Sequence, residues 1–167
     1  MVVRGRKERI YKPRAEPEPP SELEVRLHQT QDDFVACTKP YKGLTSGRGG
    51  GKSYVGAYDF LLHCKPNTVG LVIAPTYKML SDSTQRSFVE LAKQMGMWND
   101  KRFHKTDNVA VLNNGVEVLF RSGEDPDKLR GSTVYRIWAD ECSLLKESVY
   151  EIAIACLRWS SPDPLVF

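Results

Sequence analysis

The amino-acid sequence predicts an α/β fold in which helices flank a mainly parallel sheet. Short strand-like runs alternate along the chain with segments of helical spacing, which is the order expected of such a sheet. The run at 69–74 is apolar at every position, as in a parallel strand covered on both faces. A glycine-rich segment at 47–51 lies between an expected strand and an expected helix, where the chain must turn sharply.

The elements of the first half follow from capping patterns and residue spacing. Ser21 and Glu24 have the spacing of a capping box, which predicts a short helix after them. Val55, Tyr58 and Leu62 recur on one face of a helical segment. In chain order we expect short helices at 21–27 and 32–37, a strand at 41–45, a helix at 53–64, a strand at 69–74 and a long helix at 78–95.

A β-hairpin is predicted in the second half. Asn113-Asn114-Gly115 separates two runs rich in strand-forming residues, and Asn-Gly in that position is a strong turn signal. The expected elements are hairpin strands at 109–112 and 116–120, a strand at 134–139, a helix at 146–157 and the start of a strand at 165–167. Because apolar residues continue to the last position, we expect a fragment of a longer protein, truncated at its C-terminal end.

Charge and proline content divide the chain into a short arm and one domain. The net charge of the 167 residues is +3, and the whole excess lies in residues 1–20, which also carry four prolines. We expect 1–20 to be a flexible basic arm and 21–167 to form a single domain, since 41% hydrophobic residues suffice for a core. The balanced charge of the domain gives no general argument for nucleic-acid binding.

The sequence carries no sign of a membrane span, a secretory signal or a zinc site. No apolar run approaches the roughly 20 residues that cross a membrane, and the first residues have no long apolar core. The cysteines form no CxxC pair and do not cluster with histidines, so we expect reduced, buried thiols in an intracellular protein. They are Cys37, Cys64, Cys142 and Cys156.

The sharpest signal is a phosphate-binding loop. Ser46-Gly47-Arg48-Gly49-Gly50-Gly51-Lys52-Ser53 matches the pattern GxxxxGK[ST], with Ser46 in place of the first glycine. The glycines let backbone N–H groups approach phosphate oxygens, Lys52 would reach the β- and γ-phosphates, and the Ser53 hydroxyl would ligate Mg²⁺. Arg48 has two interpretations, a phosphate contact or a solvated side chain. The alternative for the whole segment is a glycine-rich turn that contains Lys-Ser by chance.

Two acidic residues follow the strand predicted at 134–139. Such a strand would deliver Asp140 and Glu141 to the carboxyl edge of the sheet, beside the loop. Asp140 would hold Mg²⁺, and Glu141 suits a general base that polarises the attacking water. Adjacent strand residues point to opposite faces, so both can share this edge only where the chain leaves the sheet. Taken alone, the pair also fits an ordinary strand that leads into a capped helix.

These residues together resemble the N-terminal ATPase region of the large terminase subunit, the DNA-packaging motor of tailed double-stranded DNA phages. The resemblance covers about 27–158. Gln31, with Phe34 after it, precedes the loop as an adenine-reading glutamine does in that family. The other matching segments are the loop with its internal Arg48, Ala74-Pro75-Thr76-Tyr77, Asp127-Lys128-Leu129-Arg130-Gly131, and Trp138-Ala139-Asp140-Glu141-Cys142, where the family usually has a small residue after the glutamate.

The resemblance implies a P-loop NTPase fold of the additional-strand catalytic-glutamate type. It implies an enzyme that binds and hydrolyses ATP with Mg²⁺ to drive double-stranded DNA into a procapsid. Glu141, Arg48 and Arg130 would be catalytic, Arg130 as an arginine finger acting on a neighbouring subunit or in cis. The alternative for Arg130 is an ordinary pairing with Asp125 or Asp127. The implied partners are a portal protein, a small terminase subunit and further copies in a ring, in the host cell cytoplasm at the procapsid portal.

Two parts of that family's pattern are missing, and two rival functions stay open. A threonine-containing coupling segment would follow Phe167, and the C-terminal nuclease domain is absent, so we do not expect DNA cleavage. One rival is a superfamily-2-like helicase or translocase, and the other is a non-catalytic nucleotide-gated assembly module.

Six basic residues would either follow a DNA backbone or form a solvated face. They are Lys78, Arg86, Lys93, Lys101, Arg102 and Lys105.

Overall fold

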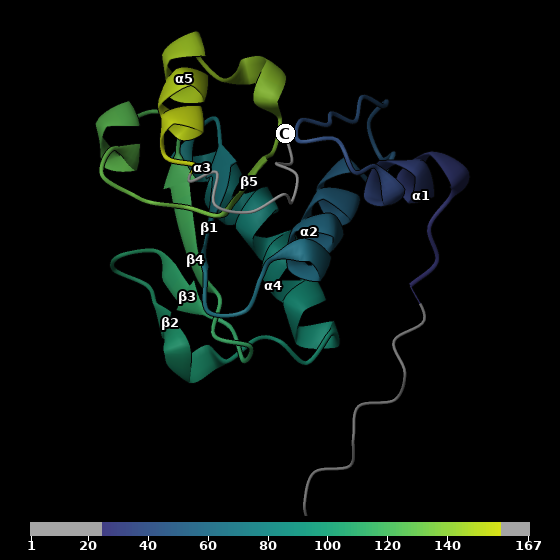
Figure 1. The fold of residues 1–167 in the computed structure, drawn as a ribbon, viewed down its shortest axis with the longest axis horizontal. Coiled ribbons are helices and arrows are strands. Elements are labelled where there is room, and N and C mark those ends of the chain that lie inside the picture. Colours follow the sequence, from purple (N-terminus) through teal and green to yellow (C-terminus); the bar gives the residue numbers. More distant parts are fainter. Residues whose placement is uncertain (1–24, 158–167) are drawn as a thin grey trace, which may run out of the picture.

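A sheet with a parallel centre forms the middle of the domain (Figure 1). The computed structural model describes residues 25–157, and its sheet has the strand order β2-β3-β4-β1-β5. Strand β1 pairs in parallel with β4 and with β5, whereas β2, β3 and β4 pair antiparallel, which confirms the predicted fold class. The strands are β1 (Val69–Ala74), β2 (Phe103–His104), β3 (Val109–Val111), β4 (Glu117–Ser122) and β5 (Arg136–Ala139).

Helices cover both faces of this sheet, because its central strands are apolar on both sides. Val72 and Ala74 of β1 pack in the cluster formed with α2 and α4, whereas Leu71 and Ile73 pack in the cluster formed with α5. The fold is therefore a three-layer sandwich, helices on sheet on helices. The helices are α1 (Gln29–Ala36), α2 (Lys52–His63), α4 (Gln85–Gln94) and α5 (Glu147–Ala155), with short 3₁₀ turns at Asp100–Arg102, Pro126–Leu129 and Cys142–Leu144.

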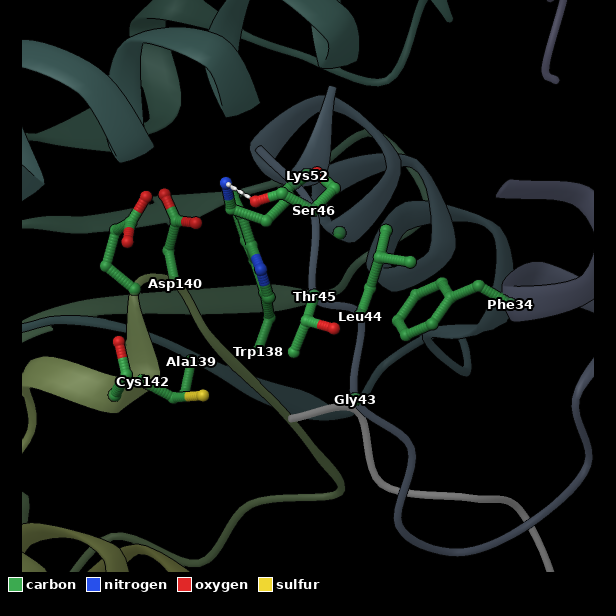
Figure 2. Close-up of a pocket in the computed structure, with 13 residues that line it drawn as sticks. Phe34, Gly43, Leu44, Thr45, Ser46, Lys52, Trp138, Ala139, Asp140 and Cys142 are labelled. Carbon is green, nitrogen blue, oxygen red and sulfur yellow. Dashed lines mark hydrogen bonds between the residues drawn. The ribbon is translucent and has the colours of Figure 1, made fainter. Parts of the chain in front are cut away.

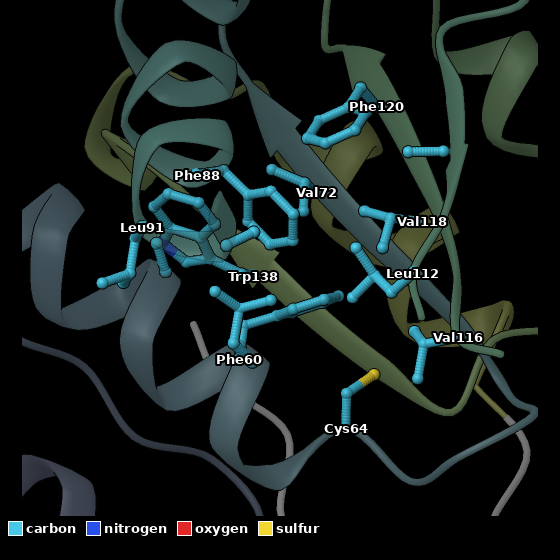
Figure 3. Packing of buried hydrophobic residues seen from close by; sticks show 14 of the residues in the cluster. Phe60, Cys64, Val72, Phe88, Leu91, Leu112, Val116, Val118, Phe120 and Trp138 are labelled. Atoms are coloured by element: carbon cyan, nitrogen blue, oxygen red, sulfur yellow. The ribbon is translucent and has the colours of Figure 1, made fainter. Parts of the chain in front are cut away.

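An aromatic cluster joins α2 and α4 to the sheet (Figure 3). The ring of Phe88 lies edge-on to Phe60 and Phe120, with centroids 5.6 and 5.3 Å apart, and it stacks on Trp138 at 6.4 Å. A Cβ added at Gly56 would meet the Trp138 indole, so α2 approaches β5 closely there. This packing fixes the helix that follows the glycine-rich loop against the strand that ends in Asp140.

The predicted hairpin is confirmed, and it is part of the main sheet. Strands β3 and β4 pair antiparallel, and the Leu112 amide donates to the Val116 carbonyl at 2.8 Å. Gly115 has a φ of 85°, the left-handed conformation that glycine adopts without strain. The second strand of the hairpin, β4, is also the parallel neighbour of β1.

The segment predicted as one long helix at 78–95 is helical but contains a π turn. It consists of α3 (Tyr77–Met79), a π-helical turn (Leu80–Thr84) and α4. A π turn holds more residues than an α turn and so changes the direction in which later side chains point. Here it leaves Thr84 only 2% exposed.

The prediction of a strand at 41–45 is wrong, because the structure forms no strand there. Burial alternates as in an extended segment, with Lys42 buried and with Tyr41 and Thr45 exposed, but no described strand pairs with it. A strand is stable only when a neighbour satisfies its backbone groups, and the apolar pattern cannot reveal whether one is present.

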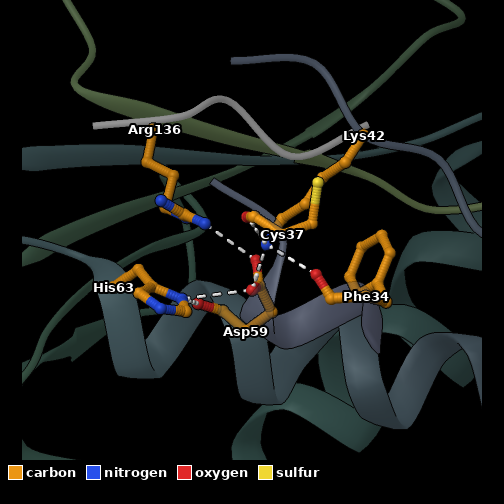
Figure 4. Close-up of polar contacts among 6 residues, drawn as sticks. All are labelled: Phe34, Cys37, Lys42, Asp59, His63 and Arg136. Carbon is orange, nitrogen blue, oxygen red and sulfur yellow. Dashed lines mark hydrogen bonds and ion pairs between the residues drawn. The ribbon is translucent and has the colours of Figure 1, made fainter. Parts of the chain in front are cut away.

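The side chain of Lys42 anchors the segment at 41–45 in a buried group of charged residues (Figure 4). Asp59, fully buried on α2, accepts a hydrogen bond from Lys42 Nζ at 2.6 Å and one from Arg136 Nη2 at 2.8 Å. Lys42 also donates to the carbonyl oxygens of Phe34 and Cys37, at 3.0 and 3.3 Å. One carboxylate thus joins the segment before the loop, α2 and the start of β5.

The remaining predictions concern the two ends of the chain. The helix expected at 32–37 begins earlier, at Gln29, and the one expected at 146–157 is α5. Residues 25–28 have irregular backbone, so the helix expected at 21–27 does not reach its predicted end. The basic arm at 1–20 and the strand start at 165–167 lie outside the described residues. Among residues 25–157, no helix has the length and apolar character needed to cross a membrane.

Candidate functional site

The glycine-rich loop lies at the N-terminal end of α2, as predicted. Gly49 and Gly51 have φ values of 79° and 73°, so both positions need glycine. A Cβ at Gly50 would meet the Ser46 side chain, and one at Gly51 would meet the amide of Gln31. The loop is therefore a tight backbone turn that opens a helix, where N–H groups and the helix dipole favour an anion.

Lys52 folds back over this loop (Figure 2). Its ammonium donates to the carbonyl oxygens of Ser46 and Gly47, at 3.2 and 3.4 Å. These bonds hold the charge beside the turn that a phosphate would enter, without an acidic partner among the described residues. An anion bound in the turn would be a stronger partner for the ammonium than two neutral carbonyls.

Asp140 lies against the first turn of α2 and is only 5% exposed. The Ser53 hydroxyl donates to Asp140 Oδ1 at 3.0 Å, and the Thr84 hydroxyl donates to Oδ2 at 2.8 Å. Within 25–157 no cationic side chain pairs with this carboxylate. A nearly buried carboxylate without a counter-ion is costly, and a hydroxyl plus a carboxylate are hard oxygen ligands, so Ser53 and Asp140 fit a Mg²⁺ ion.

Thr84 is a site residue that the sequence analysis missed. Its only signal is position, because it stands four residues after Leu80 and four before Phe88, on the buried face of a helical segment. A polar residue on such a face requires a partner, which here is Asp140. The sequence could not name that partner, since the two residues are 56 positions apart.

Glu141 stands where the chain leaves β5. The strand ends at Ala139, the Asp140 amide still donates to the Ile73 carbonyl, and Glu141 has φ 49° and ψ 42°. A left-handed conformation is uncommon for a residue with a side chain and costs about 1 kcal/mol or more. The turn lets Asp140 face α2 while the exposed Glu141 side chain stays at the same edge of the sheet. Both carboxylates therefore share this edge at the point where the chain leaves the sheet, as expected from the sequence.

A pocket of about 270 Å³ lies between this strand end and the loop (Figure 2). Its polar lining includes Ser46, Lys52, Asp140 and Glu141, and its apolar lining includes Phe34, Leu44 and Trp138. The volume is near the lower end of the range for ligand sites, roughly 300–1,000 Å³. The structure therefore brings the loop lysine and both acidic residues to one opening.

Gln31 and Arg48 also belong to this part of the structure. Gln31 is buried, its Oε1 accepts from the His28 amide at 3.2 Å, and its Nε2 donates to the Gly50 carbonyl at 3.4 Å. It thus braces the loop from α1. Arg48 projects from the loop, is exposed and pairs with no carboxylate among residues 25–157.

Arg130 is the one predicted site residue that the described chain does not bring to its own loop. It is exposed, and its Nε lies 2.8 Å from Asp127 Oδ1. In Figure 1 the short green helix that precedes Arg130 lies beyond α5, on the side away from the loop. Arg130 does not line the pocket beside the loop of its own chain.

The cysteines and the six basic residues at 78–105 differ in how far they are exposed. The four cysteines are free, as expected, but Cys142 is exposed and Cys37 half-buried, so burial was wrongly expected for these two. Burial raises the pKa of the Cys64 thiol to about 11.

All six basic residues at 78–105 are exposed. Arg86 pairs with Glu90 at 3.1 Å, and Lys93 pairs with Asp100 at 3.0 Å. No group of three or more metal-ligating side chains occurs between residues 25 and 157.

Known proteins share this sequence pattern and this fold. The PBSX phage terminase large subunit of Bacillus subtilis strain 168 is 28% identical over 130 residues, which cover 76% of this chain and 30% of that protein. The large terminase of a thermophilic bacteriophage superposes with a TM-score of 0.72 at 17% identity, over 86% of this chain and 39% of that one. The ATPase domain of a Thermus phage large terminase gives 0.57 at 20% identity, over 88% and 68%.

These matches cover most of this chain but a minor part of the full-length relatives. The chain spans 30% of the length of the PBSX protein and 39% of that of the thermophilic phage terminase. Residues 38–165 match the family model described as phage terminase large subunit, and they include the loop and both acidic residues. The chain therefore belongs to the phage terminase large subunit family.

Proposed function

We propose that this chain binds ATP with Mg²⁺ at the loop 46–53 and hydrolyses it as the ATPase part of a motor that moves double-stranded DNA into a procapsid. The observation that carries the proposal is the 3.0 Å hydrogen bond from Ser53 to Asp140. It joins the last residue of the phosphate-binding pattern to the acidic strand end. A similar large terminase has been solved with ADP and with ATP-γ-S, which supports a nucleotide as the ligand.

The loop and α2 hold the nucleotide phosphates in this proposal. Backbone N–H groups of the glycine turn donate to phosphate oxygens, and the Lys52 ammonium exchanges its bonds to Ser46 and Gly47 for the β- and γ-phosphates. Ser53 and Asp140 hold the Mg²⁺ ion. When bound, the ion supplies positive charge that stabilises the phosphate oxygens in the transition state. Gln31, next to the loop, reads the adenine ring by exchanging its bonds to His28 and Gly50 for bonds to the base.

Glu141 is the general base. Its turn places the carboxylate at the opening that Lys52 and Asp140 also line, where a water molecule can approach a γ-phosphate. The carboxylate orients this water and accepts its proton as the oxygen attacks phosphorus, while the bond to the leaving ADP oxygen breaks. Trp138 and Phe34 form the apolar side of the pocket and limit competing water.

The two arginines neutralise charge on the transferred phosphoryl group. Arg48 does so from within the loop, as an exposed side chain without an acidic partner in the described chain. Arg130 does so for a neighbouring copy, since it does not line the pocket beside its own loop, and it must leave Asp127 to act. This assignment requires neighbouring copies, and we propose that they form a ring that works with a portal protein and a small terminase subunit in the host cell cytoplasm.

Binding and turnover measured on matched variants test the proposal. Lys52→Ala is expected to lose ATP binding, whereas Glu141→Gln is expected to bind ATP normally and to release phosphate about a hundredfold or more slowly. Glu151→Gln, which changes an exposed carboxylate on α5, is the control and should match the wild type. The assays use the full chain at high concentration with duplex DNA, so that copies can assemble.

The outcomes separate this proposal from its rivals. Equal phosphate release by wild type and Glu141→Gln would contradict hydrolysis at this site. If Mg²⁺-dependent ATP binding persisted in that case, a nucleotide-gated assembly module would be favoured instead. The helicase alternative loses its main support, because the matching family model and relatives are terminases.

A further inference from the structure

A second pocket opens at the same edge of the sheet, beyond the end of β4. It has a volume of about 370 Å³, and its polar lining includes Tyr77, Thr106, Asp107, Arg121, Ser122 and Lys128. Strand β1 lies between β4 and β5 in the sheet, so the strand ends beside this pocket and beside the loop pocket are two strand spacings apart, about 10 Å. They share no lining residue, and the proposed ATPase mechanism uses none of the six.

Arg121 gives this pocket a positive charge that forms no ion pair within the described residues. Its Nη1 donates to the carbonyl oxygens of Asp107, Phe120 and Asn108, at 2.8, 2.9 and 3.5 Å. In the described chain, Nε and Nη2 have no hydrogen-bond partner, and no carboxylate forms an ion pair with the guanidinium. Burial lowers the pKa of Arg121 from its ordinary value, against the opposing attraction of Asp107 and Glu117. A half-buried guanidinium in this position gains from an anion.

The other groups around Arg121 fit a tetrahedral oxyanion. The hydroxyl-bearing residues Ser122, Thr106 and Tyr77 line the same opening, and Lys128 lies at its rim. Lys128 is 3.3 Å from Asp125 and 74% exposed, so it is free to turn toward a ligand. The carboxylate of Asp107 opposes an anion but does not form an ion pair with Arg121 within 25–157. Two guanidinium nitrogens with unused N–H donors, a lysine and several hydroxyls are the usual chemistry of phosphate recognition.

We propose that the Arg121 pocket binds a phosphate group, separately from the nucleotide loop. A free phosphate and a phosphate of a nucleic-acid backbone have the same chemistry, and the experiment distinguishes these two sources. The site does not depend on ATP hydrolysis, so it can be tested in a chain whose nucleotide loop is disabled.

The test uses the full chain carrying Lys52→Ala, which removes competing phosphate binding at the loop. Inorganic phosphate and a short DNA duplex are titrated separately, while NMR follows the Arg121 Nε–H signal and the backbone amides of 106–108 and 121–123. Arg121→Gln is expected to weaken binding about tenfold or more, because it removes charge-assisted hydrogen bonds. Lys128→Gln, at the exposed rim, is expected to weaken it about threefold.

Lys65→Gln is the matched control, since Lys65 is exposed and precedes β1 at the opposite edge of the sheet. A response to phosphate alone identifies a free anion as the ligand, and a stronger response to the duplex identifies the backbone. Because Arg121 also holds the 107–108 backbone, Lys128→Gln provides a variant without that structural role. The proposal is overturned if neither ligand shifts these signals, if both pocket variants bind like the parent, or if Lys65→Gln weakens binding equally.

Discussion

The hydroxyl of Thr84 donates a hydrogen bond to Oδ2 of Asp140 at 2.8 Å, from a residue 56 positions earlier in the chain. Both groups are almost fully buried, and Thr84 ends the π-helical turn that connects α3 to α4. Ser53 holds the other carboxylate oxygen, so hydroxyls from two separate segments fix Asp140. The carboxylate that would hold Mg²⁺ is thereby oriented before any ligand binds.

Replacing Thr84 by valine is expected to weaken Mg²⁺-dependent ATP binding about tenfold, because Oδ2 loses its donor while the side-chain shape is kept. Thr84→Ser retains the hydroxyl and should bind ATP almost as well as the wild type. ATP affinity measured with and without Mg²⁺ checks this. A loss of affinity of the same size in the absence of Mg²⁺ would show that Thr84 only supports the fold.

Gly51→Ala is expected to lower the free energy of unfolding by about 1–2 kcal/mol, since φ is 73° and a Cβ would meet Gln31. Gly47→Ala is the control, because the space around Gly47 is open and its φ lies outside the left-handed region. Its free energy of unfolding should change by less than about 1 kcal/mol. Urea unfolding compares the two, and equal effects would rule out a conformational requirement specific to Gly51.

Asp59→Ala is expected to lower the free energy of unfolding by about 3–5 kcal/mol, because it leaves the buried Lys42 without its anion and removes the contact to Arg136. Asp33→Ala, at an exposed position on α1, should cost less than about 0.5 kcal/mol. Denaturant unfolding monitored by circular dichroism gives both values. A cost below 1 kcal/mol for Asp59→Ala would mean that the buried charges are held by other groups.

Cys142 is expected to react with a maleimide at neutral pH far faster than Cys64, because Cys142 is exposed whereas Cys64 is buried. Cys142 also lines the pocket beside Glu141, so saturating ATP should slow its labelling. Mass spectrometry of digested protein identifies the labelled cysteine, and Cys142→Ser should remove the fast reaction. Labelling that ATP leaves unchanged would argue against nucleotide in this pocket.

The free energy of unfolding is expected to fall between pH 9 and 11 more steeply for the wild type than for Cys64→Ala. The unfolded thiol loses its proton near its ordinary pKa of 9.0, whereas burial in the folded protein raises the pKa to about 11. The stabilisation is therefore complete below pH 9 and is lost as the pH rises toward 11. Parallel pH dependence of the two proteins would show that Cys64 does not titrate differently on folding.

The elements predicted most closely were those whose pattern reflects burial on known faces. Strand β1 has the predicted bounds. Every residue at 69–74 is apolar, which is the pattern of a strand that helices cover on both faces of the sheet. The hairpin followed from Asn-Gly, a signal local to the turn. The segment at 41–45 is short and only partly apolar, and it has no described neighbouring strand, so local pattern alone gave the wrong element.

The sequence by itself determined the phosphate-binding pattern and the acidic pair, because each depends on residues a few positions apart, and the family resemblance, because it depends on several such local segments in a fixed order. Only the tertiary structure decided that Ser53 and Thr84 hold opposite oxygens of Asp140 and that Asp59 joins Lys42 to Arg136. Such contacts join residues distant in the chain. Their partners are set by sheet order and by the π turn, which no local spacing specifies.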